Sequence, residues 1–283
     1  MIIIDGKKLS QEILAKVKTE VEALPFQPVF CDVLVGSDKV SMQYVKMKAR
    51  TALSVGILFH EANFPLSITT EELIKNIKIL NKIPNICGII LQLPLPAHID
   101  LRLALDAVDP NIDVDCLGSI ASQKFYTNTN EIGFPTALAC MRLVDTLDLD
   151  LKDKKIVVLG QGNLVGKPVT ALLEFRGLNP IVIRSKTENK EELIKQADII
   201  ISGIGKSKYL TGDMLKKGVI LIDAGTSESN SDSSGTKVSI VGDVDLESVK
   251  DVAGYVSPVP GGVGPMTVAM LLNNVFMVAK SKE

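Results

Sequence analysis

The sequence has few of the side chains from which metal sites, disulfide frameworks and nucleic-acid surfaces are built. Aromatic residues make up 4% of the 283 residues, and the formal net charge is −2. A chain with no basic excess and no surplus of base-stacking rings does not predict a nucleic-acid partner. The four cysteines are widely spaced without a C-x-x-C pair, and only two histidines accompany them. We therefore expect neither a bound metal nor disulfides.

Long apolar runs are also scarce. The isoleucine run near the start has three residues, and we expect no segment to approach the roughly 18 apolar residues of a membrane span. These features predict a reduced, cytoplasmic protein with no membrane partner. The length is large for one domain and comfortable for two.

Helix and strand patterns alternate along the first half of the chain. Apolar spacing predicts helices over residues 9–24, 39–54 and 71–80, and strands over 29–36, 57–64 and 87–96. The last strand has the composition of a buried strand in a parallel sheet, and it runs into two prolines. Active groups gather at the carboxyl ends of such strands, which draws attention to Gln92.

The second half repeats the alternation after a break. Periodicity fades over residues 108–137, where we place the domain junction. Beyond it the sequence predicts a helix near 165–175 and strands over 155–160, 180–185, 197–205, 218–225 and 238–244. This is an α/β protein of two domains, the second a doubly wound dinucleotide-binding domain. We expect the polar run 227–237 to be a surface loop.

Three glycines follow the first strand of the second half. Gly160, Gly162 and Gly166 form a G-x-G-x-x-x-G pattern, one residue longer than the commonest dinucleotide fingerprint. Glycines permit a tight turn and close approach to a phosphate, and the following helix offers free N–H groups at its start. We interpret this loop as a phosphate site, with an ordinary strand-to-helix turn as the alternative.

The next strand ends in Arg184 and Ser185 rather than in an acid. An acid at this place would hold a ribose 2′-hydroxyl, whereas a guanidinium and a hydroxyl can bind a 2′-phosphate. We therefore expect NADP as the cofactor, with NAD possible in its place. A solvated arginine at a strand end is the alternative.

Four other residues are candidates for chemistry. Tyr44 and Lys48 stand four residues apart, on one face of a predicted helix. A lysine beside an aromatic ring in a cleft can lose solvation and exchange protons, although such pairs are more often solvated surface. Asp113 and Asp115 share one face of an extended segment, where they can bind a cation or cap a helix. Without further ligands we do not expect a metal.

Five segments together resemble one family. The sequence is similar to the bifunctional methylenetetrahydrofolate dehydrogenase/cyclohydrolase family in "VGSDKVSMQYVKMKARTALSVGI", "GIILQLPLPAHI", "DVD", "VVLGQGNLVGKPV" and "SPVPGGVGPMT". The order and spacing match over nearly the whole chain. The resemblance implies oxidation of 5,10-methylenetetrahydrofolate with NADP, hydrolysis of the methenyl product to 10-formyltetrahydrofolate, and a homodimer.

The resemblance also implies roles for individual residues. Tyr44 stacks on the folate, Lys48 is the acid/base group of hydrolysis, Gln92 hydrogen-bonds and tunes that lysine, and Asp115 grips the pterin ring. The expected cofactor residues are Gly160, Gln161, Gly162, Val165, Gly166, Arg184, Ser185 and Thr226. Pro260, Gly261 and Gly262 belong to the loop that lines the folate and nicotinamide side.

The implied architecture has a cleft between two domains. We expect a folate-binding domain over residues 1–118, joined by a C-terminal helix at 264–283, and a Rossmann-type NAD(P)-binding domain over 119–263. The chain departs from the family where G-R-S is replaced by Gly160–Gln161–Gly162 and P-C-T-P by "FPTA" at 134–137. The K-D-V-D-G segment is likewise replaced by "IDVDC" at 112–116.

Three other functions fit part of the pattern. A dehydrogenase without hydrolase activity, including one that uses NAD, would share nearly every motif, although Tyr44, Lys48 and Gln92 are intact. An oxidoreductase for hydroxy acids would need a catalytic histidine or arginine, and neither histidine is in a promising context. A non-catalytic module that binds the cofactor would not need Lys48.

Overall fold

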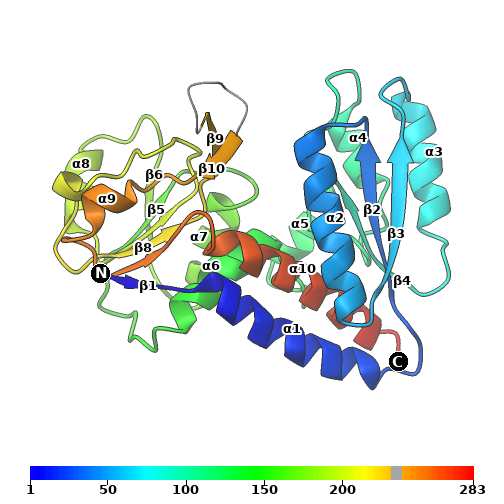
Figure 1. Cartoon of the computed structure of the whole chain (residues 1–283), viewed down its shortest axis with the longest axis horizontal. Coiled ribbons are helices and arrows are strands. Elements are labelled where there is room, and N and C mark those ends of the chain that lie inside the picture. Colours follow the sequence, from blue (N-terminus) through cyan, green and yellow to red (C-terminus); the bar gives the residue numbers. More distant parts are fainter. Residues whose placement is uncertain (231–237) are drawn as a thin grey trace. The chain divides into compact units, whose positions relative to one another are not determined.

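The structure is a computed structural model that describes residues 1–230 and 238–283 (Figure 1). Its contacts divide it into two compact units. The three-stranded unit comprises Gln11–Pro135 and Val268–Glu283, and the six-stranded unit comprises Met1–Ser10 and Thr136–Thr267. The grouping differs from the expected domain ranges in Met1–Ser10 and in residues 119–135 and 264–267. The functional division of the chain therefore stays a prediction.

The three-stranded unit is built from βαβ repeats. Its parallel sheet has β2 (Val29–Val35) between β3 (Leu58–Phe64) and β4 (Ile86–Leu91), and the crossovers contain α2 (Lys39–Ser54) and α3 (Thr70–Leu80). Figure 1 shows these helices beside the strands. β4 is buried along its whole length and β2 along nearly all of it, whereas the edge strand β3 is largely exposed. The predicted order of these elements is confirmed.

Three helices follow β4 in a region where no helix was predicted. They are α4 (Leu101–Asp106), α5 (Ser119–Tyr126) and α6 (Pro135–Asp145). α6 begins at a proline, a residue suited to the first helical turn. α4 and α5 span 6 and 8 residues, too few for a clear apolar period.

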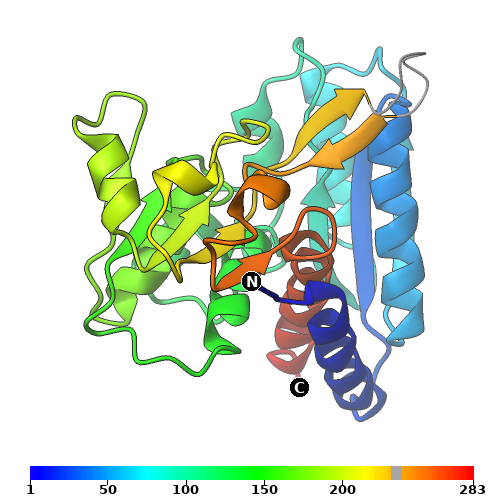
Figure 2. The ribbon, with the colours of Figure 1, turned by 60° about the vertical axis from the view of Figure 1, so that its left-hand side comes forward.

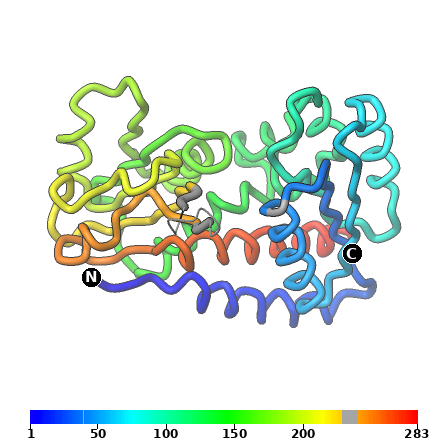
Figure 3. Tube along the Cα trace, turned by 45° about the horizontal axis from the view of Figure 1, so that its top comes forward, coloured from blue at the N-terminus to red at the C-terminus, as the bar shows by residue number. Residues whose placement is uncertain are grey.

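The six-stranded unit has an all-parallel sheet in the order β1-β11-β8-β7-β5-β6. The strands are β1 (Ile2–Ile3), β11 (Tyr255–Ser257), β8 (Ile220–Asp223), β7 (Ile199–Ser202), β5 (Ile156–Leu159) and β6 (Ile181–Ile183). α7 (Gly166–Phe175) and α8 (Lys190–Gln196) connect β5, β6 and β7. The doubly wound fold is confirmed. β1 and β11 were not predicted, and Figure 3 shows the start of the chain beside the segment that contains β11.

A separate hairpin belongs to the same unit (Figure 2). β9 (Ser227–Asn230) pairs antiparallel with β10 (Val238–Val241) in its own two-stranded sheet. The prediction of a surface loop over 227–237 is therefore wrong for Ser227–Asn230, and its remainder lies outside the described residues. β10 was expected among the strands of the doubly wound domain, but within the described residues it pairs with β9 alone.

The helices α1 (Gly6–Glu22) and α10 (Val263–Lys280) contain residues of both units. The expectation that no segment approaches a membrane span is wrong for α10, whose 18 residues have a mean hydropathy of 1.3. The helix is 61% buried within the protein, which explains its composition. Its buried Asn274 donates to the carbonyl oxygens of Val114 and Gly133 at 2.9 and 2.7 Å. α10 is thus a core helix. The short α9 (Leu246–Val249) and the 3₁₀ turn Gly212–Met214 complete the described elements.

Candidate functional site

Lys48 lies inside the protein although it belongs to a polar helix. α2 begins after Asp38, whose carboxylate accepts a hydrogen bond from the Ser41 N–H at 2.8 Å and thereby caps the helix. In the register set by this start, the Lys48 residue is 7% exposed, while Tyr44, one turn earlier, is 37% exposed. The neighbouring Lys46 is exposed. Lys48 is therefore not one of the solvated surface lysines of this helix.

The Lys48 ammonium contacts one side chain of β2 and one that directly follows β4. Its Nζ donates to Gln92 Oε1 at 2.8 Å and lies 2.6 Å from Asp32 Oδ2. Gln92 directly follows β4, and its Nε2 donates to the Leu93 carbonyl oxygen at 3.0 Å, which fixes the orientation of the amide. The structure thus brings together Lys48 and Gln92, two residues named from the sequence.

Asp32 is the residue of this site that sequence reasoning missed. It lies in β2, is 0% exposed, and forms an ion pair with Lys48. Apart from this ion pair, neither oxygen of its carboxylate has a hydrogen-bond partner among the described residues. Burial raises the pKa of Asp32, and the charge of Lys48 acts in the opposite direction. The available signal was an acid within the apolar run "VFCDVLV".

Asp113 and Asp115 have different environments. Asp113 is buried, and its Oδ2 accepts from the Gly118 N–H at 2.7 Å, so it holds the turn before α5. Burial raises the pKa of Asp113, against the effect of its backbone donors. The Asp115 residue is half-buried, and burial of its carboxyl group raises its pKa to about 7. The charge of Lys48 lowers this pKa, and the acids Asp113 and Asp32 raise it. Asp115 can therefore change protonation near neutral pH.

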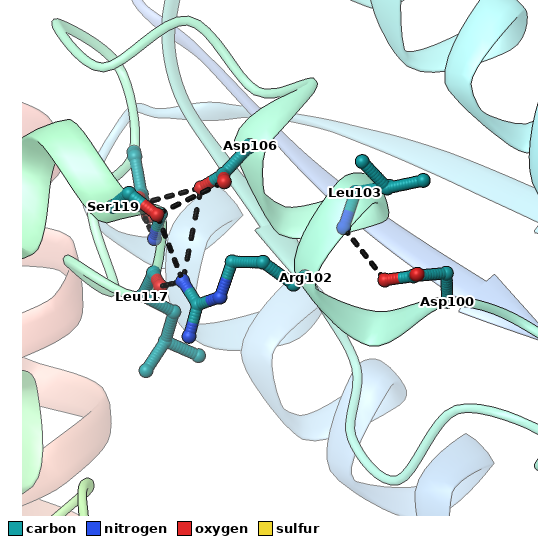
Figure 4. Close-up of polar contacts among 8 residues, drawn as sticks. Asp100, Arg102, Leu103, Asp106, Leu117 and Ser119 are labelled. Atoms are coloured by element: carbon teal, nitrogen blue, oxygen red, sulfur yellow. Dashed lines mark hydrogen bonds and ion pairs between the residues drawn. The ribbon is translucent and has the colours of Figure 1, made fainter.

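A hydrogen-bond network holds the end of the segment that carries Asp115 (Figure 4). The Asp106 carboxylate accepts from the Ser119 N–H at 2.6 Å and from the Ser119 hydroxyl at 2.9 Å. Arg102 donates to the Leu117 carbonyl oxygen at 2.9 Å and forms an ion pair with Asp106 at 3.7 Å. α4 and the start of α5 are thus fixed together, which limits the positions that Asp115 can take.

The glycine loop connects β5 to α7. Gly160 has φ +96°, and a Cβ at Gly166 would overlap the carbonyl oxygen of Gly160, so both positions require glycine for the turn itself. Apart from Gly162 itself and its two chain neighbours, no atom of the described residues lies within 4 Å of the place where a Cβ of Gly162 would be. The packing of the chain itself therefore does not require a glycine there, whereas the approach of a ligand to the backbone would. Val165 precedes α7 as its N-cap and makes no side-chain cap hydrogen bond.

The side chain of Gln161 is turned back onto the loop. Its Nε2 donates to the Gly160 carbonyl oxygen at 2.9 Å and to the Thr170 hydroxyl at 3.0 Å. Thr170 lies in α7, so this amide fastens the loop to the helix. The Nε2 group of Gln161 is thus used within the loop.

Three exposed residues lie at strand ends of the same unit. β6 pairs with β5, and the Gly160 N–H donates to the Ile183 carbonyl oxygen at 2.9 Å, so Arg184 and Ser185 begin next to the glycine loop. The Arg184 guanidinium has no partner among the described residues, although its backbone N–H donates to Thr187 at 2.9 Å. Thr226 is exposed between β8 and β9.

In the proline–glycine loop after β11, the backbones of Gly261 and Gly262 both form hydrogen bonds. The Gly262 N–H donates to the Pro258 carbonyl oxygen at 2.7 Å, and the Gly261 carbonyl oxygen accepts from the Lys7 N–H at 3.1 Å. Pro260 is exposed at the tip. This loop is thus fixed by its own backbone and by the start of α1.

No group of three or more His, Cys, Asp or Glu residues in the described ranges 1–230 and 238–283 is arranged to hold a metal ion. The four cysteines are buried and free.

Two family models match the chain. Residues 4–115 match the catalytic domain of tetrahydrofolate dehydrogenase/cyclohydrolase, and residues 135–283 match its NAD(P)-binding domain. The chain belongs to the tetrahydrofolate dehydrogenase/cyclohydrolase family. The resemblance in the sequence motifs is thereby confirmed.

Individual members of the tetrahydrofolate dehydrogenase/cyclohydrolase family match over at least 98% of their length. The bifunctional protein FolD of Nautilia profundicola is 42% identical over 99% of this chain and 98% of that protein. The structure of the bifunctional FolD enzyme of Campylobacter jejuni covers 100% of both chains with a TM-score of 0.93 and 36% identity. That of the Trypanosoma brucei enzyme, complexed with NADP and an inhibitor, covers 100% of this chain and 98% of its own, with a TM-score of 0.92 and 31% identity.

Proposed function

We propose that this family member oxidises 5,10-methylenetetrahydrofolate with NADP and hydrolyses the methenyl product to 10-formyltetrahydrofolate. The observation that carries the proposal is the buried lysine that donates to Gln92 at 2.8 Å. A buried amine held by an oriented amide is a group suited to proton transfer. The relatives named as bifunctional, and the one complexed with NADP, support both activities.

Hydrolysis requires proton transfers that Lys48 can perform. Water adds to the methenyl carbon and loses a proton, N5 gains a proton as its bond to that carbon breaks, and the hydroxyl loses its proton as the formyl group forms. One proton is released overall. A lysine ammonium has three N–H groups, and Gln92 and Asp32 take two directions around Nζ. The third direction remains for the reacting atoms.

Tyr44 and Asp115 fit the binding of the folate. The half-exposed ring of Tyr44, one turn from Lys48, offers a face on which a flat ring can stack. Asp115, with its pKa raised to about 7, can act as a hydrogen-bond donor or acceptor for the polar edge of the pterin. We propose that Asp115 hydrogen-bonds to the pterin and that the ring of Tyr44 stacks on the folate.

The residues of the six-stranded unit fit NADP. The open space at Gly162 and the N-terminus of α7, which begins at Gly166 after Val165, suit a pyrophosphate. Gly160 shapes the turn and Gln161 secures it, while the free guanidinium of Arg184 suits a 2′-phosphate. Ser185, Thr226, Pro260, Gly261 and Gly262 complete the proposed contacts. When bound, NADP supplies the acceptor for the hydride that leaves the methylene carbon.

The remaining assignments follow from the family resemblance. We assign folate binding to residues 1–118 with 264–283, and NADP binding to residues 119–263. We also propose that the chain acts as a homodimer in the cytoplasm. Size-exclusion chromatography with light scattering tests the dimer, and a molar mass of one chain would contradict it.

A spectrophotometric assay tests both activities together. The purified chain is given 5,10-methylenetetrahydrofolate with NADP or with NAD, and the formation and decay of the methenyl compound are followed against buffer alone. We expect faster formation with NADP and decay faster than in buffer. Formation followed by decay only at the buffer rate would indicate the monofunctional alternative. No formation with either cofactor would contradict the proposed function.

A further inference from the structure

We propose that Asp32 is a positioning residue for Lys48: its carboxylate holds the Lys48 ammonium against Gln92 and stabilises its positive charge. The inference rests on the proposed function, in which Lys48 transfers protons during hydrolysis. No motif of the sequence and no part of the resemblance assigns a role to Asp32.

The position of Asp32 makes it a fixed support. β2 is the central strand of its sheet, and Asp32 is paired in register with Glu61 of β3 and Ile90 of β4. Its side chain is fully buried, and its Oδ2 lies 2.6 Å from Lys48 Nζ. The strand cannot shift without moving both neighbours, so the carboxylate defines one place for the ammonium.

The bonding of Asp32 differs from that of acids that serve the fold. The buried Asp223 accepts from the N–H groups of Gly225, Asp243 and Val244 at 2.9 to 3.0 Å, and its bonds tie the end of β8 to the backbone at Asp243 and Val244. Asp32 accepts no such bond among the described residues. A buried carboxylate is costly unless it is paired, and Lys48 is the partner that offsets this cost. The structure thus gives Asp32 a contact with the proposed catalytic amine and no contact of the kind that holds a fold.

Lys48 is the charged group with the largest effect on the pKa of Asp32, after the effect of burial. Burial raises the pKa of Asp32, the charge of Lys48 lowers it, and Glu61 on the adjacent strand raises it. Asp32 in turn contributes to the raised pKa of Asp115 and, after burial, to the pKa of about 12 of the Cys31 thiol. Among these groups Lys48 is the cation and the others are acids.

This arrangement has a consequence for catalysis. A negative charge at 2.6 Å favours the ammonium form of Lys48. Opposite charges within about 4 to 6 Å move titrations by about 1 to 3 pH units. If Asp32 is made neutral, the limb of the pH–rate profile that reports Lys48 must move to lower pH. The shift is to lower pH whether the reaction requires Lys48 as the neutral amine or as the ammonium.

The test uses two neutral variants and a matched control. We measure the pH–rate profile for hydrolysis of the methenyl compound. In Asp32→Asn and Asp32→Val we expect the limb of this profile that reports Lys48 to move by about 1 to 3 pH units to lower pH. We also expect an amine-reactive reagent at pH 8 to label Lys48 at least about tenfold faster, as followed by peptide mass spectrometry. Glu61→Gln removes an exposed negative charge from the paired position and is expected to move neither readout. Asp32→Glu keeps the charge and should keep the limb near the wild-type position.

Two outcomes would overturn the inference. One is an unshifted limb together with unchanged labelling of Lys48 in both neutral variants. The other is loss of the folded state in both, by circular dichroism, because Asp32 would then serve the fold. Absence of both activities in the wild-type chain would refute the proposed function instead, and the labelling of Lys48 would still test the ion pair.

Discussion

At the scale of the residue, the candidate site depends on a balance of buried charges. Lys48 and Asp32 each lose most of their hydration, and each is compensated mainly by the other. Breaking such a pair on one side is more costly than replacing both members, because it leaves a single buried charge. Activity and stability are therefore linked at this point of the chain.

Lys48→Met is expected to lower the hydrolysis of the methenyl compound at least about 100-fold, because it removes the proposed acid/base group. It also leaves Asp32 without a partner, so we expect the free energy of unfolding in urea to fall by about 3 kcal/mol. The double variant Lys48→Met with Asp32→Asn should recover part of that loss. Lys46→Met, at an exposed position two residues away, is the control. Unimpaired hydrolysis in Lys48→Met would remove this lysine from the mechanism.

Arg184→Ala is expected to raise the KM for NADP about tenfold or more and to change the KM for NAD far less. The reason is that the exposed, unpaired guanidinium is proposed to bind the 2′-phosphate, which NAD lacks. Steady-state kinetics with each cofactor provide the measurement, and Arg142→Ala on α6 is the control. Equal changes for both cofactors would show that Arg184 does not read the 2′-phosphate.

The sequence located Lys48, Tyr44, Gln92 and Asp115 through motifs, but it could not show their contacts. Spacing within a helix relates Tyr44 to Lys48, whereas the bond between Lys48 and Gln92 joins residues 44 positions apart. Asp32 was missed because an isolated acid in an apolar strand fits no motif. Only the folded sheet shows that this acid faces Lys48.

At the scale of the element, the glycine loop shows two uses of the same residue type. Gly160 and Gly166 are needed for the turn, whereas Gly162 borders open space. A shared motif therefore contains positions that serve the fold and a position that is free to serve a ligand.

Substitutions in this loop should separate the two uses. Gly162→Ala is expected to change the thermal midpoint of the ligand-free protein little and to raise the Kd for NADP at least about tenfold, because the added methyl group enters the phosphate space. Gly166→Ala is expected to lower the midpoint itself, because the methyl group overlaps the Gly160 carbonyl. Differential scanning fluorimetry and calorimetric titration measure the two effects. Unchanged NADP binding in Gly162→Ala would argue against a phosphate at this position.

The longer elements were predictable from apolar periodicity, and the short ones were not. α2, α3, β2, β4 and β5 lie where the spacing indicated. β1 and β11 have 2 and 3 residues, and their place in the sheet depends on pairing partners rather than on composition. The same reason applies to β10: its apolar residues predicted a strand, but they could not predict its antiparallel pairing with β9.

At the scale of the whole molecule, buried acids make stability depend on pH. Burial raises the pKa of Asp115 to about 7 and that of Asp223 to about 6, and it also raises those of Asp32 and Asp113. The folded state then binds protons more tightly than the unfolded state, whose carboxyl groups ionise near the ordinary value of 3.8. Stability from these groups is therefore greatest at low pH and falls as the pH rises through this window.

We expect the thermal midpoint of the ligand-free protein to decline between pH 5 and about pH 7.5, and Asp115→Asn to flatten that decline. The pKa values of three other acids are lowered from the ordinary value of 3.8, so their protonation affects stability only at pH values below this window; they are Asp38, Asp198 and Asp213. Asp148→Asn, at an exposed position, is the control and should keep the wild-type slope. An equal slope in Asp115→Asn would contradict the raised pKa of Asp115.

The pairing of β1 with β11 has a consequence for the order of assembly during synthesis. β1 is made before β11, lies at the edge of the sheet formed by the described strands, and pairs there with β11. At translation rates of about 5 to 20 residues per second, the ribosome needs roughly 10 to 50 s to reach β11 after β1 has been made. During this interval the first strand has no native partner in its sheet. A ribosome-bound chain stopped before Tyr255 should therefore expose its first residues to protease, and release of the full chain should protect them.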